Sequence, residues 1–204
     1  IRKLIRQENY RFSDFVIIAR DTERYKEAVD YACKKNEINC FFDDKLPLSS
    51  FPLCVATDYA IKALNFSTEN ILRFHKSGIE VLTDDEISTL ENYTYLWNIN
   101  GEIWLKEWDM DVRGFVTDEP TEFDAQKLSN INRLRQKAIE PLIRFKEEFK
   151  FNAKNMARAI TNLFDKCDAK KALNRLCQSF DNDVFTVDFL KGGYDEFMKI
   201  LDSL

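Results

Sequence analysis

The 204-residue sequence is poor in the residues on which metal sites and tight turns depend. It contains one histidine, five glycines, four prolines and five cysteines. The cysteines, at positions 33, 40, 54, 167 and 177, are odd in number and include no CxxC pair. With only one histidine beside them, they argue against a zinc site and are typical of reduced thiols in a cytosolic protein. We therefore expect a metal-independent protein in the cytoplasm.

Long apolar runs are missing as well. No run approaches the roughly 20 residues that a helix needs to cross a bilayer, so we expect no membrane partner. The net charge is −5, with 35 acidic and 30 basic residues. An acidic balance argues against non-specific binding of nucleic acid over the whole surface, but it leaves room for a local basic face.

Residues 1–66 have the pattern of an α/β segment. The run at 15–19, Phe-Val-Ile-Ile-Ala, is short, continuous and β-branched, which predicts a strand buried on both faces of a parallel sheet. A helical pattern follows from Thr22, and Cys-Phe-Phe at 40–42 predicts a second, parallel strand. Another helix is predicted from Pro52. The expected fold of this part is a β-α-β unit.

Two strands alone expose unpaired ladder groups on both edges and cannot carry a stable sheet. We therefore expect the remaining strands to lie elsewhere in a larger protein. A first residue that is not methionine, Ile1, fits the same expectation of an internal fragment.

Residues 67–204 have an almost wholly helical pattern. Thr83 and Glu86 form a capping box that predicts the start of one helix. A longer helix is predicted over about residues 124–150, with a kink at Pro141. The expected fold class of the whole chain is thus α/β plus mainly α.

The last third of the chain predicts further helices, capped by Asn152 and Asp168. The pair Gly192-Gly193 predicts a break in the final helical region. Tryptophans at 97, 104 and 108 are expected to anchor a loop to the core, with stacking on nucleic-acid bases as the alternative. His75 is expected to be a solvated residue at a helix C-terminus.

Several motifs together carry a resemblance to a known family. Residues 10–21, Tyr-Arg-Phe-Ser-Asp-Phe-Val-Ile-Ile-Ala-Arg-Asp, resemble the opening of the second RecA-like domain in UvrD-type superfamily 1 helicases. The "Ile-Pro"-like turn of those helicases is Glu-Ile-Asn at 37–39 here, without the proline. Leu-Glu-Asn-Tyr at 90–93 and Ile-Asn-Arg-Leu-Arg at 131–135 follow in an order that resembles AddB-type subunits of bacterial helicase–nucleases, over roughly residues 1–150.

The resemblance implies a division of labour. Residues 1–66 would be part of the second RecA-like helicase domain, and residues 67–204 a helical insertion domain. The parent enzyme would process double-strand DNA ends for recombinational repair, with ATP, Mg and an iron–sulfur cluster as cofactors and an AddA-type subunit and DNA as partners. This chain would be a non-catalytic part that contributes DNA contact and inter-subunit structure.

Arg20 is the residue to which the resemblance assigns a chemical role. It matches the arginine that senses the γ-phosphate of a nucleotide in such helicases; the alternative is an ordinary ion pair with a neighbouring surface carboxylate. No GxxxxGK[ST] phosphate loop occurs in the sequence, so we expect no catalytic residues and no ATPase activity in this chain.

Four basic residues are candidates for DNA contact. Arg133 and Lys137 share a face of the long helix, while Arg135 points elsewhere. Lys154 and Arg158 follow nearby in the sequence. The alternative for this group is a solvated helix face. The alternative for the whole chain is a stand-alone helical protein-interaction module with no nucleotide or DNA role.

Overall fold

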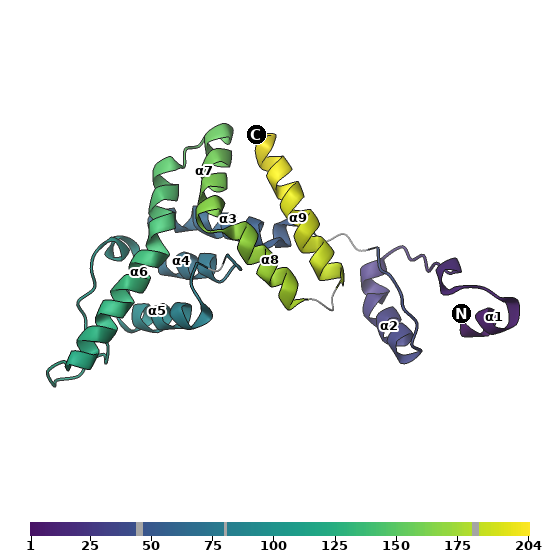
Figure 1. The fold of residues 1–204 in the computed structure, drawn as a ribbon, viewed down its shortest axis with the longest axis horizontal. Helices are drawn as coiled ribbons and strands as arrows, with labels where there is room; N and C mark the ends of the chain where they lie inside the picture. The colour runs from purple at the N-terminus through teal and green to yellow at the C-terminus, as the bar shows by residue number, and fades with distance from the viewer. Residues whose placement is uncertain (44–46, 80, 181–183) are drawn as a thin grey trace. The chain divides into compact units, whose positions relative to one another are not determined.

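The computed structural model describes residues 1–43, 47–79, 81–180 and 184–204 (Figure 1). The chain divides into two compact units, Ile1–Lys45 and Leu46–Leu204. The first unit contains α1 (Arg2–Glu8), the 3-10 turn η1 (Phe12–Asp14) and α2 (Thr22–Lys35). The second contains η2 (Leu48–Ser50), α3 (Pro52–Lys62), η3 (Ala63–Asn65), α4 (Thr68–His75), α5 (Asp84–Leu96), η4 (Gly101–Leu105), α6 (Glu122–Glu148), α7 (Ala153–Lys166), α8 (Ala169–Ser179) and α9 (Val184–Asp202).

The prediction of a β-α-β unit was wrong. Residues 15–19 and 40–42 belong to no strand, and the regular secondary structure of the described residues consists of helices. A strand needs a neighbour with which to pair its backbone, and neither segment has one among the described residues of this unit. Most of their side chains are exposed, 87% for Ile18 and 85% for Phe41. The helix between them is confirmed as α2, and the Asp21 carboxylate caps it by accepting from the backbone amide of Arg24 at 3.3 Å.

The compact units do not divide where the sequence pattern changes. Helix α3, which was grouped with residues 1–66, packs against α4 and belongs to the second unit. Its buried residues Leu53, Ala56 and Ala60 recur at helical spacing and face that unit's core. The assignment of residues 1–66 and 67–204 to two parts of a motor domain stays a prediction.

Local signals set the ends of the helices in the second unit. Thr83 and Glu86 form the predicted capping box at the start of α5. Thr121 and Asp124 form another at the start of α6, two residues earlier than the predicted start of that helix. Pro141 lies inside α6, as predicted. Such caps satisfy backbone donors that a helix leaves free in its first turn.

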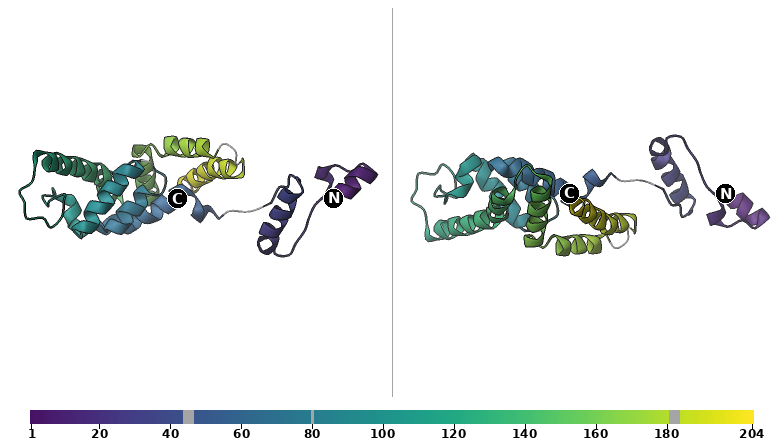
Figure 2. Two further views of the ribbon diagram at one scale, coloured as in Figure 1. Left: turned by 90° about the horizontal axis from the view of Figure 1, so that it is seen from below. Right: turned by 90° about the horizontal axis from the view of Figure 1, so that it is seen from above.

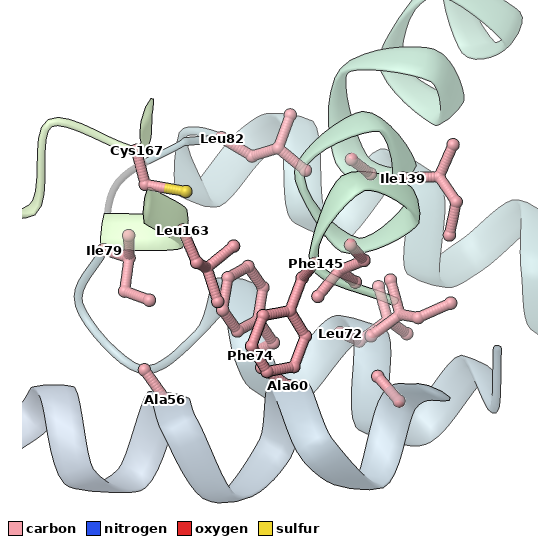
Figure 3. Packing of buried hydrophobic residues seen from close by; sticks show 14 of the residues in the cluster. Ala56, Ala60, Leu72, Phe74, Ile79, Leu82, Ile139, Phe145, Leu163 and Cys167 are labelled. Atoms are coloured by element: carbon pink, nitrogen blue, oxygen red, sulfur yellow. The ribbon is translucent and has the colours of Figure 1, made fainter. Parts of the chain in front are cut away.

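The core of the second unit lies where α3, α4, α6 and α7 meet (Figure 3). Phe74 of α4 is fully buried there, with Phe145 of α6 and Leu163 of α7 close by. Small residues of α3, Ala56 and Ala60, let the neighbouring backbones approach closely. The burial of these side chains is the main source of the unit's stability.

The segment between α5 and α6 is held to this core by its tryptophans, as predicted. Trp104 and Trp108 are 0% and 2% exposed, so base stacking on either ring is excluded in this fold. The Trp104 indole N–H donates to the Thr68 hydroxyl at 2.8 Å. Trp97 is half-buried and donates to the backbone oxygen of Asp111 at 3.1 Å.

His75 differs from its predicted place in solvent. It is 2% exposed, and its Nε2 donates to the Ala138 carbonyl oxygen at 2.9 Å, while its Nδ1 has no hydrogen-bond partner among the described residues. Burial lowers its pKa to about 4; the hydrogen bond to Ala138 opposes this shift and the Lys137 charge adds to it. The side chain is therefore a neutral bridge from α4 to α6.

The glycine pair does not break the last helix. Helix α9 runs without interruption from Val184 to Asp202, and views from two further directions show it beside α8 (Figure 2). The reason lies in packing, because a Cβ atom on Gly193 would lie 2.7 Å from Cδ2 of Phe51. Gly193 lets α9 approach the core, whereas Gly192 has open space around its Cα.

Candidate nucleic-acid interface

Charge is unevenly distributed along the second unit. Residues 47–121 contain thirteen Asp and Glu but only five Lys and Arg. Residues 122–179, from the start of α6 to the end of α8, contain thirteen Lys and Arg against seven Asp and Glu. A polyanion is repelled by the first stretch and attracted by the second. Positive charge is therefore concentrated on α6, α7 and α8, although the chain as a whole has a net charge of −5.

Two of the four candidate residues are engaged in an ion-pair network between α5 and α6. Lys137 Nζ lies 2.8 Å from Glu86 Oε2, and Arg133 Nη2 lies 3.9 Å from Glu86 Oε1. Burial would raise the pKa of Glu86, but the hydrogen bonds from Lys137 and from the Thr83 amide, together with both positive charges, lower it below its ordinary value. This carboxylate therefore stays charged and offsets part of the positive potential of Arg133 and Lys137.

Lys154 and Arg158 are placed differently. Both are exposed, and they lie one turn apart on the same face of α7. Within the described residues, neither side chain makes a hydrogen bond or an ion pair. The positive charges of Lys154 and Arg158 are thus free to meet phosphate oxygens, and these two residues are the strongest DNA-contact candidates among the four. We call the surface that they share the basic face of α7.

Arg135 does not belong to this face, as its helical position indicated. It is 5% exposed and donates to the Trp104 backbone oxygen at 2.7 Å and to the Asn132 side-chain oxygen at 3.2 Å. Asn132 in turn bonds both backbone groups of Trp108, at 2.9 and 2.8 Å. The role of Arg135 is to hold the tryptophan loop against α6.

Arg20 lies in the first unit, exposed, at the bend between residues 15–19 and α2. The segment before it is not a strand, so the geometry on which its nucleotide-sensing role was predicted is not present. That role stays a prediction that rests on the resemblance alone.

A pocket of about 350 Å³ lies among α7, α8 and α9, and sequence reasoning missed it. Tyr194 and Met198 of α9 form one wall, and Phe164 of α7 lies in the interior. Lys170 of α8 places its ammonium 5.6 Å from the centre of the Tyr194 ring. The remaining lining residues are polar or small: Thr161, Asp165, Asp168, Ala169, Lys171 and Asn174. The available signal was the spacing 154, 158, 161 and 165, which puts two candidates and two lining residues on one face of α7.

The described residues include no set of side chains that fits an iron–sulfur cluster or another metal. Among the described residues, no three His, Cys, Asp or Glu side chains gather as metal ligands. Burial raises the pKa of the Cys167 thiol to about 12, the opposite of what a thiolate ligand requires. The Asp111 carboxylate is paired with the Arg113 guanidinium at 2.8 Å.

The fold and charge thus define a helical module with a basic face. No family model matches the sequence. The chain is 29% identical over 178 residues to the AddB subunit of the ATP-dependent helicase/deoxyribonuclease of Clostridium perfringens (strain ATCC 13124), covering 83% of the chain. It is 32% identical over 170 residues to the same subunit of Thermoanaerobacter sp. (strain X514), covering 81% of the chain. The chain spans only 15% and 14% of the lengths of these relatives.

The chain is therefore a relative of the AddB subunits of ATP-dependent helicase/deoxyribonucleases, and the predicted resemblance to this family is confirmed. The match to the Clostridium tetani subunit reaches 188 residues, 88% of the chain, at 29% identity. No helix among the described residues has the length and apolarity that a membrane span requires.

Proposed function

We propose that this chain is a non-catalytic part of a helicase–nuclease subunit that processes double-strand DNA ends for recombinational repair. In this proposal the first unit and the core of the second contribute inter-subunit structure, and the basic face of α7 contacts DNA. The observation that carries the DNA contact is the pair Lys154 and Arg158, exposed on one face and without intramolecular partners in the described part of the chain.

Three observations support the proposal. The relatives are named as subunits of ATP-dependent helicase/deoxyribonucleases. The basic residues concentrate on α6 to α8 although the chain as a whole is acidic. Their side chains contact phosphates at any sequence, which suits an enzyme that moves along DNA. The alternative of a stand-alone interaction module does not account for the similarity to helicase/deoxyribonuclease subunits.

Cofactors and partners follow from the same proposal. ATP, Mg and an iron–sulfur cluster would be bound by other parts of the longer subunit, because neither a phosphate loop nor a cysteine cluster is found in the described residues of this chain. An AddA-type subunit and DNA would be its macromolecular partners. Arg20 would sense nucleotide only when a neighbouring domain presents it.

The test is a salt titration of DNA binding by fluorescence anisotropy. We expect weak binding of a duplex oligonucleotide whose affinity falls steeply with salt. Reversing both charges, Lys154→Glu with Arg158→Glu, should weaken binding on the order of 10-fold and lower the slope of log affinity against log salt by about 2. The single variant Lys154→Glu is matched by Lys106→Glu, which changes another exposed lysine, in the acidic stretch, by the same two charges and should leave duplex binding within about 2-fold.

Equal loss in the Lys106 variant would show that only net charge matters, and the assignment of the interface to α7 would fail. Tight, salt-insensitive binding would contradict phosphate contact altogether.

A further inference from the structure

The pocket among α7, α8 and α9 is continuous with the basic face. At about 3.6 residues per turn, Lys154, Arg158, Thr161 and Asp165 all lie within about 40° of one line along α7. The first two residues are the DNA-contact candidates, and the last two line the pocket. A DNA strand whose phosphates contact Lys154 and Arg158 would therefore lie along α7 and reach the opening of the pocket.

We infer that this pocket holds one unpaired base of single-stranded DNA, stacked on Tyr194, and that it favours bases with an exocyclic amine. The inference rests on the proposed function and extends it from phosphate contact to recognition of a base. It concerns a place that none of the predicted site residues occupies.

The size and walls of the pocket suit a nucleobase. Its volume of about 350 Å³ accommodates a single planar ring system with some water. Tyr194 is half-buried and offers an aromatic face, on which bases of any sequence can stack. The Lys170 ammonium now 5.6 Å from that ring is on a flexible side chain, and it can leave the ring to meet the phosphate of the incoming nucleotide.

The polar groups of the pocket favour particular bases. The carboxylates of Asp165 and Asp168 accept hydrogen bonds and donate none at neutral pH, and neither has a partner within the described residues. Cytosine, adenine and guanine carry amino groups that such carboxylates accept from, whereas thymine carries none. The same carboxylates repel phosphate, so the backbone must stay at the rim with Lys170 and Lys171 while the base enters.

A paired base cannot make this contact. In a duplex the base edge is engaged by its partner and both faces are stacked, so the free-energy cost of extrusion cancels much of what stacking on one aromatic ring contributes. The pocket therefore separates single-stranded DNA from duplex, whereas Lys154 and Arg158 bind both.

The test compares oligo(dC), oligo(dA), oligo(dT) and a blunt duplex of about 12 nucleotides by anisotropy titration at one salt concentration. We expect oligo(dC) and oligo(dA) to bind more tightly than oligo(dT). Tyr194→Ala should weaken oligo(dC) binding on the order of 10-fold and leave duplex binding unchanged, while Tyr194→Phe, which keeps the ring, should bind normally. Tyr95→Ala is the matched control, since Tyr95 is 64% exposed on α5 in the acidic stretch. Asp165→Asn should reduce the preference for oligo(dC) over oligo(dT).

Failure of the inference is distinguishable from failure of the proposed function. Suppose duplex binding depends on Lys154 and Arg158 while Tyr194→Ala leaves oligo(dC) affinity unchanged: the pocket inference alone is then overturned. Loss of both duplex and single-strand binding in Tyr194→Ala, but not in Tyr194→Phe, would mean that the ring supports the fold and would also overturn it. Absence of DNA binding in the unaltered chain would refute both.

Discussion

The two compact units of this chain treat their apolar side chains in opposite ways. Among the described residues of the first unit, Cys33 is the one apolar residue that is buried. Val16, Ile18 and Phe41 are 80%, 87% and 85% exposed. A groove of about 630 Å³ lies between α2 and its two flanking extended segments. In the second unit Phe51, Phe74 and Trp104 are each 0% exposed within one continuous core.

The difference teaches where the stability of the chain resides. Burial of apolar surface is the main favourable term in folding, so the second unit stabilises itself while the first gains little from its own contacts. The second unit therefore supplies a rigid frame for the basic face and the pocket on α7.

The largest effect is expected from truncating a buried ring and comparing it with an exposed one. Phe74→Ala removes a fully buried side chain and should lower the free energy of unfolding of the second unit by about 3–5 kcal/mol. Phe41→Ala makes the same chemical change in the first unit, at a site that is 85% exposed, and it should change the free energy of unfolding of that unit by less than about 0.5 kcal/mol. Urea denaturation measures both, and comparable losses would abolish the contrast between the units.

The second effect is the pH dependence caused by His75. Its pKa is about 4 in the folded state and about 6.5 in the unfolded chain, so between these values the unfolded state binds more protons. The free energy of unfolding should therefore fall as the pH drops from about 6.5 to about 4, and His75 should account for up to about 3 kcal/mol of this fall. Below about pH 4 the contribution of His75 should no longer change with pH. His75→Gln can still donate to the Ala138 oxygen but does not titrate. The unaltered chain should lose more stability than this variant on acidification, and parallel pH profiles would show that His75 is not buried and neutral.

The third effect compares two adjacent glycines. Gly193→Ala places a Cβ within 2.7 Å of the Phe51 ring and should destabilise the second unit by about 1–3 kcal/mol. Gly192→Ala meets no neighbour and should instead stabilise α9 by up to about 1 kcal/mol. Thermal unfolding followed by circular dichroism separates the two. A stabilising Gly193→Ala would mean that α9 does not pack on Phe51.

The smallest effect concerns the ion pairs between α5 and α6. Glu86→Gln retains an acceptor for the capping box but removes the charge that holds Lys137 and Arg133. The substitution should lower the free energy of unfolding of the second unit by about 0.5–1 kcal/mol at low salt and by less at high salt. The same variant frees two positive charges and should tighten duplex binding slightly. If affinity falls instead, the network itself positions the DNA contact.

The sequence predicted the helical part of this fold well because its signals are local. The capping box at Thr83, the cap at Asn152 and the start of α3 at Pro52 act over a single helical turn, and all three are confirmed. The different orientation of Arg135 followed from helical periodicity alone. Such features depend on spacing within one helix and not on distant partners.

One local prediction was wrong: Asp168 occupies the N-cap position of α8, but its side chain makes no cap hydrogen bond. The other wrong predictions depended on partners far away in the sequence. Residues 15–19 have strand-forming side chains, but a strand forms only when another pairs with it. His75 is buried because it meets Ala138, 63 residues away. Gly193 is tolerated within α9 because it contacts Phe51. The pocket at Tyr194 joins three helices, so no single segment of the sequence could have indicated its full lining.

The central claim is that DNA meets this chain on α7 and α8. Photo-crosslinking tests it most directly: single-stranded DNA with a photoreactive base is bound to the chain, irradiated, and the attached peptides are identified by mass spectrometry. The account predicts that crosslinks concentrate on residues 154–174 and on Tyr194, and that they decline with added salt. Crosslinks that fall instead on the acidic residues 84–119, or that persist unchanged in the Lys154→Glu, Arg158→Glu variant, would contradict it.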